Sequence, residues 1–149
     1  MISKILVPTD GSKTAQKAAG YGVDLAKELK ASVIVLSVID QRSFIGQTVP
    51  AAQTAMHVIE PIEDYLREAA EAYAGEIKKL CEKNGVHSKT VITTGHPVEE
   101  IVKEAKKVKA DLIVMGSHGR SALAVAVLGS VAYGVIHKDT KIPVLVTNK

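Results

Sequence analysis

The sequence predicts an α/β fold: a single-domain three-layer sandwich with a five-stranded parallel sheet and helices on both of its faces. Two observations carry this prediction. Apolar runs of strand length alternate along the chain with segments whose apolar residues repeat at helical spacing. The runs at 31–40 and 110–116 contain few polar residues, which is typical of strands covered on both faces. A chain of 149 residues suits one domain of ordinary size, and we expect residues 1–149 to form it.

The first strand and helix are predicted at the amino-terminal end. Residues 3–10, SKILVPTD, contain a short apolar run that we expect to end as a strand at Pro8, and Ser12 is a favourable N-cap for the helix after it. The second strand is predicted at 31–40, ASVIVLSVID, which is rich in Val and Ile. The helix between them carries an apolar stripe at helical spacing, formed by Ala15, Ala18, Ala19, Gly22, Val23 and Ala26.

The longest helix is predicted in the middle of the chain. Residues 41–60 keep no steady period and contain a glycine and a proline, so we expect a loop there with at most a helical turn. Pro61 suits a first helical position, and the helix should end at Asn84 and Gly85. Its apolar stripe is formed by Ile62, Leu66, Ala69, Ala70, Tyr73, Ile77 and Leu80.

The second half of the chain continues the alternation. A third strand is predicted at 86–95, a helix opened by Pro97, a fourth strand at 110–116, a short helix at 130–138 and a last, edge strand within 141–149. This order requires parallel strands joined by right-handed crossovers. In such sheets ligands bind beyond the carboxyl ends of the strands, where the strand order reverses.

Composition excludes several classes of protein. Charged residues make up 23% of the chain and hydrophobic residues 46%, as in soluble globular proteins, so we expect a cytoplasmic protein without a membrane span. The net charge of +3 is spread along the predicted helices with no basic cluster beside aromatic residues, which argues against nucleic-acid binding. Cys81 is predicted to be a buried helix residue, and the spacing of the five histidines indicates no zinc site.

The segment 116–130, GSHGRSALAVAVLGS, has glycines at both ends. Gly116 and Gly119 let the backbone turn sharply after the fourth strand. Gly129 and Ser130 open the next helix, whose unpaired amides favour a phosphate. From spacing alone, a tight turn and an ordinary helix start explain these residues equally well.

Other features of this region leave alternatives open. Asp10 follows the first strand and is either a ligand-binding group or a turn former. His118 and Arg120 either reach phosphates or are solvated loop residues. The sequence contains no GxxxxGK[ST] motif, and no GxGxxG follows its first strand, which excludes two common types of nucleotide site.

Over essentially its full length the chain resembles the universal stress protein family, and specifically its ATP-binding branch. The resemblance rests on PTDGS, VLSVID, IVMGSHGR and IPVLV, and on the family's signature of GxxG, nine residues and G[ST], which stands here as Gly116, Gly119, Gly129 and Ser130. It implies a Rossmann-like fold of the adenine nucleotide alpha hydrolase type.

The resemblance also implies a role for each matching residue. Pro8, Thr9 and Asp10 would line the adenine and ribose, and the backbone of Val38 would read the adenine edge. Met115 and Gly116 would approach the ribose and phosphates. Gly119 and Gly129 would hold the phosphates, with Ser130 and the Val131 amide at the helix start. Arg120 is a further candidate for the phosphates on its position alone.

ATP is therefore the expected ligand, with Mg²⁺ or Mn²⁺ bridging its phosphates, and the resemblance implies a homodimer through strand 142–147. We expect a nucleotide-dependent regulatory module of the stress response, because the chain lacks the phosphate-loop lysine and second acid of fast phosphoryl transfer. At most weak hydrolysis is expected. A slow ATPase or phosphate donor, and a dimeric interaction protein with a vestigial site, remain alternatives. Residues 120–128 are predicted to form a mobile flap over the phosphates.

Overall fold

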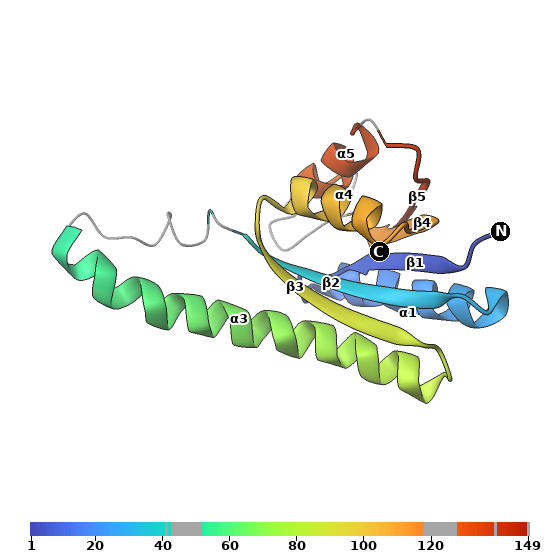
Figure 1. The fold of residues 1–149 in the computed structure, drawn as a ribbon, viewed down its shortest axis with the longest axis horizontal. Helices are drawn as coiled ribbons and strands as arrows, with labels where there is room; N and C mark the ends of the chain where they lie inside the picture. The colour runs from blue at the N-terminus through green and yellow to red at the C-terminus, as the bar shows by residue number, and fades with distance from the viewer. Residues whose placement is uncertain (41, 43–51, 118–127, 139, 149) are drawn as a thin grey trace.

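A computed structural model gives the arrangement of the chain (Figure 1). It describes residues 1–40, 42, 52–117, 128–138 and 140–148. The elements in chain order are β1 (Lys4–Pro8), α1 (Lys13–Leu29), β2 (Ser32–Asp40), α3 (Ala52–Lys83), β3 (Ser88–Gly95), α4 (Pro97–Lys107), β4 (Leu112–Gly116), α5 (Ser130–Ile136) and β5 (Val144–Thr147).

The five strands form one sheet in the order β3-β2-β1-β4-β5, and every neighbouring pair is parallel. The predicted α/β class and the five-stranded parallel sheet are therefore confirmed, and β5 lies at the edge, as expected. The order reverses at β1, which has β2 on one side and β4 on the other. A crevice for ligands is thus expected beyond the carboxyl ends of β1 and β4.

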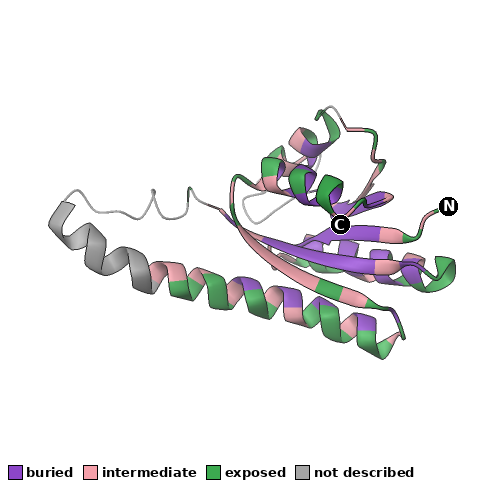
Figure 2. Ribbon diagram, in the orientation of Figure 1, coloured by how far each residue is buried: buried purple, intermediate pink, exposed green. Residues whose placement is uncertain are grey.

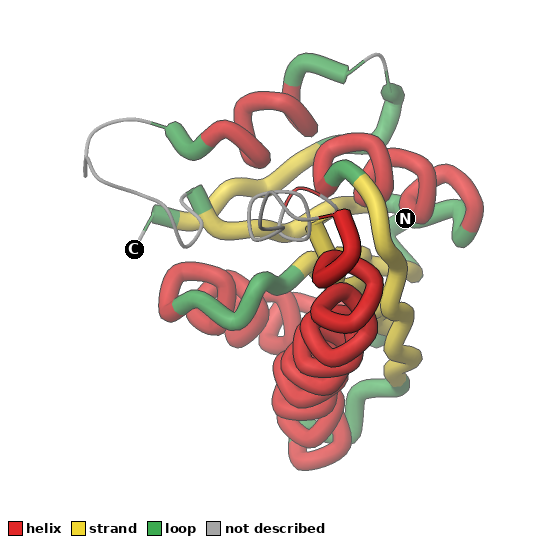
Figure 3. The backbone as a smooth tube through the Cα atoms, turned by 90° about the vertical axis from the view of Figure 1, so that its left-hand side faces the viewer, coloured by secondary structure: helices red, strands yellow, loops and turns green. Residues whose placement is uncertain are grey.

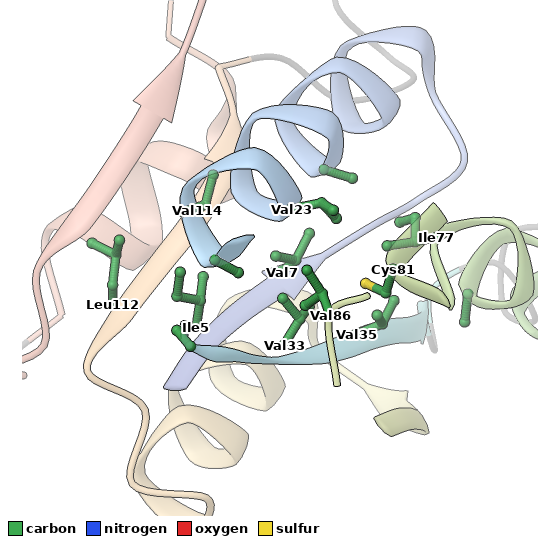
Figure 4. Close-up of a cluster of buried hydrophobic side chains, with 14 residues drawn as sticks. Ile5, Val7, Val23, Val33, Val35, Ile77, Cys81, Val86, Leu112 and Val114 are labelled. Carbon is green, nitrogen blue, oxygen red and sulfur yellow. The ribbon is translucent and has the colours of Figure 1, made fainter. Parts of the chain in front are cut away.

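Helices cover both faces of the sheet, α1 and α3 one face and α4 and α5 the other (Figures 1 and 3). Side chains of successive strand residues point to opposite faces, so Ile5 and Val7 enter the core under α1 and α3, whereas Leu6 enters the core under α4 and α5. Figure 4 shows the first core, in which β1, β2 and β4 meet Val23 of α1 and Ile77 of α3. In Figure 2 the buried residues lie mainly in the strands.

The predictions for α1 are confirmed. All six residues of the predicted stripe are buried, and the Ser12 hydroxyl caps the helix by accepting from the Ala15 N–H at 3.1 Å. In α4, Pro97 occupies the first turn, as expected.

The prediction that the long helix α3 starts at Pro61 was wrong. The helix begins at Ala52, so residues 52–60 are helical and Pro61 lies within the helix. Proline is tolerated inside a helix when the helix propensity of the other residues outweighs the loss of one backbone hydrogen bond. Residues 52–60 contain neither glycine nor a second proline. The amino-terminal part of α3 extends past the sheet (Figure 1). The end is close to the prediction, at Lys83, with Gly85 at φ 69°.

Two further expectations concern the burial of Cys81 and the presence of membrane-spanning helices. Cys81 is fully buried against the first core, and burial raises the pKa of its thiol. Among the described helices, none is long and apolar enough to cross a membrane.

Candidate functional site

The end of β1 leaves part of β2 without a partner. The last pair in register is Pro8 with Leu36, and the Thr9 N–H donates to the Leu36 carbonyl at 2.8 Å. Alternate residues of a strand turn their backbone groups to the same neighbour, so Val38 also faces the β1 side, where β1 has ended. Within the described part of β1 and its turn, no backbone group hydrogen-bonds to Val38. Val38 therefore offers a donor and an acceptor at the point where the strand order reverses.

The turn between β1 and α1 is held by short-range hydrogen bonds. The Gly11 N–H donates to Thr9 Oγ1 at 3.1 Å, and the Ser12 N–H donates to Asp10 Oδ1 at 2.9 Å. Gly11 has φ 80°, a conformation that favours glycine. Thr9 is buried and Asp10 is partly exposed. Asp10 is thus a turn former, one of the two roles predicted for it, and this role keeps its carboxylate beside the end of β1.

Gly116, at the end of β4, lies against the first turn of α1. A Cβ at this position would be 2.8 Å from Thr14 Cγ2 and 3.0 Å from the Thr14 carbonyl oxygen. Only glycine fits this approach without a shift of the neighbouring chain. The carboxyl ends of β1 and β4 are therefore drawn together through the start of α1.

One hydrogen bond joins the two glycine clusters. The Gly129 N–H donates to the Ser117 carbonyl at 2.6 Å, while the Ser117 N–H donates to the Thr147 carbonyl of β5 at 2.9 Å. Ser117 itself is buried. Residues that are separated by more than ten positions in sequence thus meet at the carboxyl edge of the sheet.

The start of α5 lies at the same edge. Gly129 is the N-cap residue, and as a glycine it has no side chain with which to cap the helix. Ser130 is exposed, and Val131 packs partly buried against the core under α4 and α5. Gly134 lets α5 approach α4 closely, because a Cβ there would lie 2.6 Å from Val98 Cγ2. This packing fixes the direction in which the first amides of α5 point.

Most predicted site residues gather at this edge: Pro8, Thr9, Asp10, Val38, Met115, Gly116, Gly129, Ser130 and Val131. The side chain of Met115 is buried in the core, so its backbone is the part available at the edge. Gly119 and Arg120 lie outside the described residues, as does the predicted flap at 120–128 apart from Leu128.

The structure adds two neighbours that the sequence did not single out. Thr14 contacts Gly116, and Tyr73 of α3 contacts Gly11. Tyr73 was predicted only as part of an apolar helix stripe. Both contacts join segments that belong to different elements, and no local pattern in the sequence signals them.

A charged pair lies at the end of β2, two residues beyond Val38. Arg42 Nη2 is 2.7 Å from Asp40 Oδ2. The hydrogen bond from Arg42 lowers the pKa of the Asp40 carboxyl group against the opposing effect of burial, and the charge of His96 adds to the lowering. The Asp40 carboxylate is thus paired with a cation that lies two residues after the end of β2.

The family model described as the universal stress protein family matches residues 1–148. The universal stress protein MJ0531 of Methanocaldococcus jannaschii is 40% identical over 149 residues, which cover all of this chain and 84% of the relative. The universal stress protein MJ0577 of the same organism is 40% identical over 158 residues, which cover all of this chain and 96% of the relative.

Solved structures agree with the sequence comparison. The structure of MJ0577 superimposes with a TM-score of 0.81 at 37% identity, covering 100% of this chain and 97% of the other. A universal stress protein in complex with cAMP superimposes with a TM-score of 0.70 at 26% identity, covering 98% and 97% of the two chains. By sequence over its full length and by its fold, the chain belongs to the universal stress protein family.

Proposed function

We propose that the chain binds ATP and acts as a nucleotide-dependent regulatory module in a stress response. The observation that carries this proposal is the 2.6 Å hydrogen bond from the Gly129 N–H to the Ser117 carbonyl. It brings Gly129 beside Ser117, the residue that directly follows Gly116, at the end of β4. A phosphate chain at that point would meet a strand-exit turn on one side and the uncapped start of α5 on the other.

The base is proposed to bind at Val38. Adenine carries an acceptor, N1, next to a donor, the N6 amino group, and this pair complements one backbone N–H and one C=O. Pro8, Thr9 and Asp10 adjoin Val38 at the end of β1 and would line the base and ribose. A universal stress protein that is 26% identical to this chain is in complex with cAMP, an adenine nucleotide, which supports the choice of an adenine ligand.

The phosphates are proposed to follow the edge from β4 to α5. Gly116 and the Met115 backbone would approach the ribose, and the amides of Gly119, Gly129 and Val131 would hold the phosphates. Ser130 and Arg120 would add a hydroxyl and a positive charge. The absence of side chains at the glycines permits a close backbone approach to the anion.

Mg²⁺ or Mn²⁺ is proposed to accompany the nucleotide. Mg²⁺ prefers oxygen ligands and is commonly bound through substrate phosphates, and the same reasoning applies to Mn²⁺. In the described part of the chain no three His, Cys, Asp or Glu side chains gather, whereas Ser130 presents a hydroxyl at the start of α5. The triphosphate would therefore supply most of the ligands of the ion.

A regulator is favoured over an enzyme. Fast phosphoryl transfer depends on positioned charges, usually a lysine and a metal-holding acid. The segment 116–130 contains no lysine and no acidic residue. Slow turnover would leave ATP bound long enough for its presence to alter what the protein contacts.

The first experiment asks whether the ligand is present. Nucleotides are released by heat from the purified protein and identified by mass spectrometry, and ATP binding is measured by calorimetry for the wild type and for Gly129→Val. We expect an adenine nucleotide and a binding isotherm for the wild type and a loss of binding in the variant, because a branched side chain would stand between the phosphates and the amides. Gly20→Ala is the control, since a Cβ there meets no atom within 4 Å.

Each alternative has its own outcome. The absence of both adenine nucleotide and calorimetric response would contradict the proposal and favour a vestigial site. Turnover of Mg-ATP that exceeds the rate of Gly129→Val would assign a slow ATPase. AMP in place of ATP would change the ligand but not the site.

A homodimer through β5 is also proposed. β5 is an edge strand, and its outer backbone groups are available to a second chain. Antiparallel pairing of two copies about a twofold axis would cover both edges at once.

A further inference from the structure

The ring of Tyr73 lies against the turn that holds Asp10. A Cβ built on Gly11 would be 2.5 Å from Tyr73 Cδ1 and 2.6 Å from Cζ, with Cε1 between them. One side of the ring, up to the carbon that carries the hydroxyl, therefore packs on the Gly11 backbone. Tyr73 comes from α3, more than sixty residues away in sequence, so the contact joins two separate elements.

A second contact joins the same two segments. Gln16 Nε2, in the first turns of α1, lies 3.4 Å from Glu76 Oε2 of α3. Glu76 is three residues after Tyr73 and so lies on the same side of α3. The start of α1 and the turn before it are thus held against α3 at two successive points.

The turn needs such a support. Its centre is Gly11, a residue with a wide choice of backbone conformations, here at φ 80°. Within the turn the Gly11 N–H donates to a side chain at 3.1 Å and the Ser12 N–H donates to a side chain at 2.9 Å. A ring packed on Gly11 removes the space into which the glycine would otherwise move.

We propose that Tyr73 is a positioning residue that holds the β1–α1 turn, and with it Asp10, in the geometry that receives the nucleotide. The inference rests on the proposed function for the nucleotide, but the positioning itself is a property of the free protein. It assigns to α3 a part in the site although no residue of α3 belongs to the glycine signature.

The first test needs no ligand. Hydrogen exchange of the Gly11 and Ser12 amides is followed by NMR in the wild type, Tyr73→Ala, Tyr73→Phe and Tyr65→Ala, with core amides of β2 as the reference for global opening. We expect faster exchange at these two amides in Tyr73→Ala relative to the β2 amides. Tyr73→Phe keeps the ring and should exchange more slowly at these amides than Tyr73→Ala does. Tyr65→Ala should match the wild type, because Tyr65 on the same helix is 70% exposed.

The second test measures ATP affinity by calorimetry for the same proteins. Tyr73→Ala should weaken ATP binding about 2- to 30-fold, the range for residues that act on a site from outside it. Tyr73→Phe, which keeps the ring, should lose less affinity than Tyr73→Ala, and Tyr65→Ala should not change the affinity.

The outcomes separate the two proposals. A wild type that binds no ATP removes the proposed function, and the exchange data alone then decide the role of Tyr73. Unchanged exchange and unchanged affinity in Tyr73→Ala would overturn the inference while leaving ATP binding intact. A Tyr73→Phe protein that behaves like Tyr73→Ala would overturn it too, because the hydroxyl and not the packed ring would then be responsible. If Tyr73→Ala does not fold, Tyr73→Leu, which keeps apolar volume without the flat ring, takes its place under the same criteria.

Discussion

At the scale of single residues, the carboxyl end of β4 depends on a side chain that is absent. A Cβ at Gly116 would meet both a side-chain carbon and the backbone of Thr14. The Thr14 side chain can rotate away from a new Cβ, but the Thr14 backbone is held in place by the hydrogen bonds of α1. This distinguishes Gly116 from Gly20 of α1, where a Cβ would meet open space.

Gly116→Ala is expected to lower the free energy of unfolding by about 1–3 kcal/mol, the usual cost of overpacking. Adding Thr14→Ala should recover part of this loss, because it removes the nearest carbon but leaves the carbonyl at 3.0 Å. Gly20→Ala should instead stabilise the protein by about 0.4–1 kcal/mol. Urea unfolding of the four proteins checks these values, and a neutral Gly116→Ala would mean that α1 yields at this point.

Asp111 makes a pH-dependent contribution to stability at the amino-terminal ends of β1 and β4, opposite the proposed site. Its Oδ2 accepts from the Ser3 N–H at 2.9 Å, from Ser3 Oγ at 3.0 Å and from the Lys4 N–H at 3.0 Å. These bonds lower the pKa of the carboxyl group in the folded protein. The stabilisation is therefore present above the unfolded pKa, about 4, and is lost as the pH falls through the lower folded value.

Asp111→Asn should consequently reduce the Tm at pH 7 and lose this effect in acid. Ser3→Ala keeps the backbone donors and should give a smaller change with the same pH dependence. Thermal unfolding followed by circular dichroism between pH 2 and 7 measures both. An Asp111→Asn difference that does not shrink in acid would show that the carboxylate is not its source.

At the scale of elements, the strands and most helix ends could be predicted from the sequence, because buried apolar runs and caps such as Ser12 are local signals. The start of α3 could not, because Pro61 matches a helix start as well as a tolerated interior position. The glycines of the signature were predicted to form one site because their spacing matches the family motif. The bond between Gly129 and Ser117 and the ring of Tyr73 on Gly11 depend on tertiary packing, which no local pattern encodes.

The orientation of β5 gives a sharp test of the proposed dimer. The Pro143 carbonyl accepts from the Ile113 N–H of β4 and the Thr147 carbonyl from the Ser117 N–H just after β4, so the backbone groups of Val146 face the open edge. Val146→Pro removes an outward N–H without breaking the ladder to β4. We expect a dimer for the wild type and for Val146→Thr, and a monomer for Val146→Pro, by light scattering at micromolar concentration.

An unchanged circular dichroism spectrum would show that Val146→Pro keeps the fold. A wild-type protein that scatters as a monomer under these conditions would count against the dimer altogether. A Val146→Pro protein that remains dimeric would place the interface elsewhere on the surface.

At the scale of the whole molecule, the proposed site lies where several elements meet, so its ligand should stabilise the entire fold. ATP at 100 times its Kd is expected to add about 2.7 kcal/mol to the free energy of unfolding. Thermal unfolding should therefore show a higher Tm with ATP and no shift with GTP, because guanine reverses the donor and acceptor that adenine presents to Val38. Gly129→Val should show no shift with either nucleotide, and an equal shift with GTP would refute recognition of the base at Val38.

The backbone of Val38, to which no described residue of β1 or its turn is hydrogen-bonded, has a consequence for which substitutions the site can accept. An N–H and a C=O are carried by every amino acid except proline, so base recognition at this position would survive most substitutions of the side chain. A mutational scan would pass over position 38 and report instead the residues that keep β1 shorter than β2. Replacement of the amide by an ester at this position is the change that would expose it.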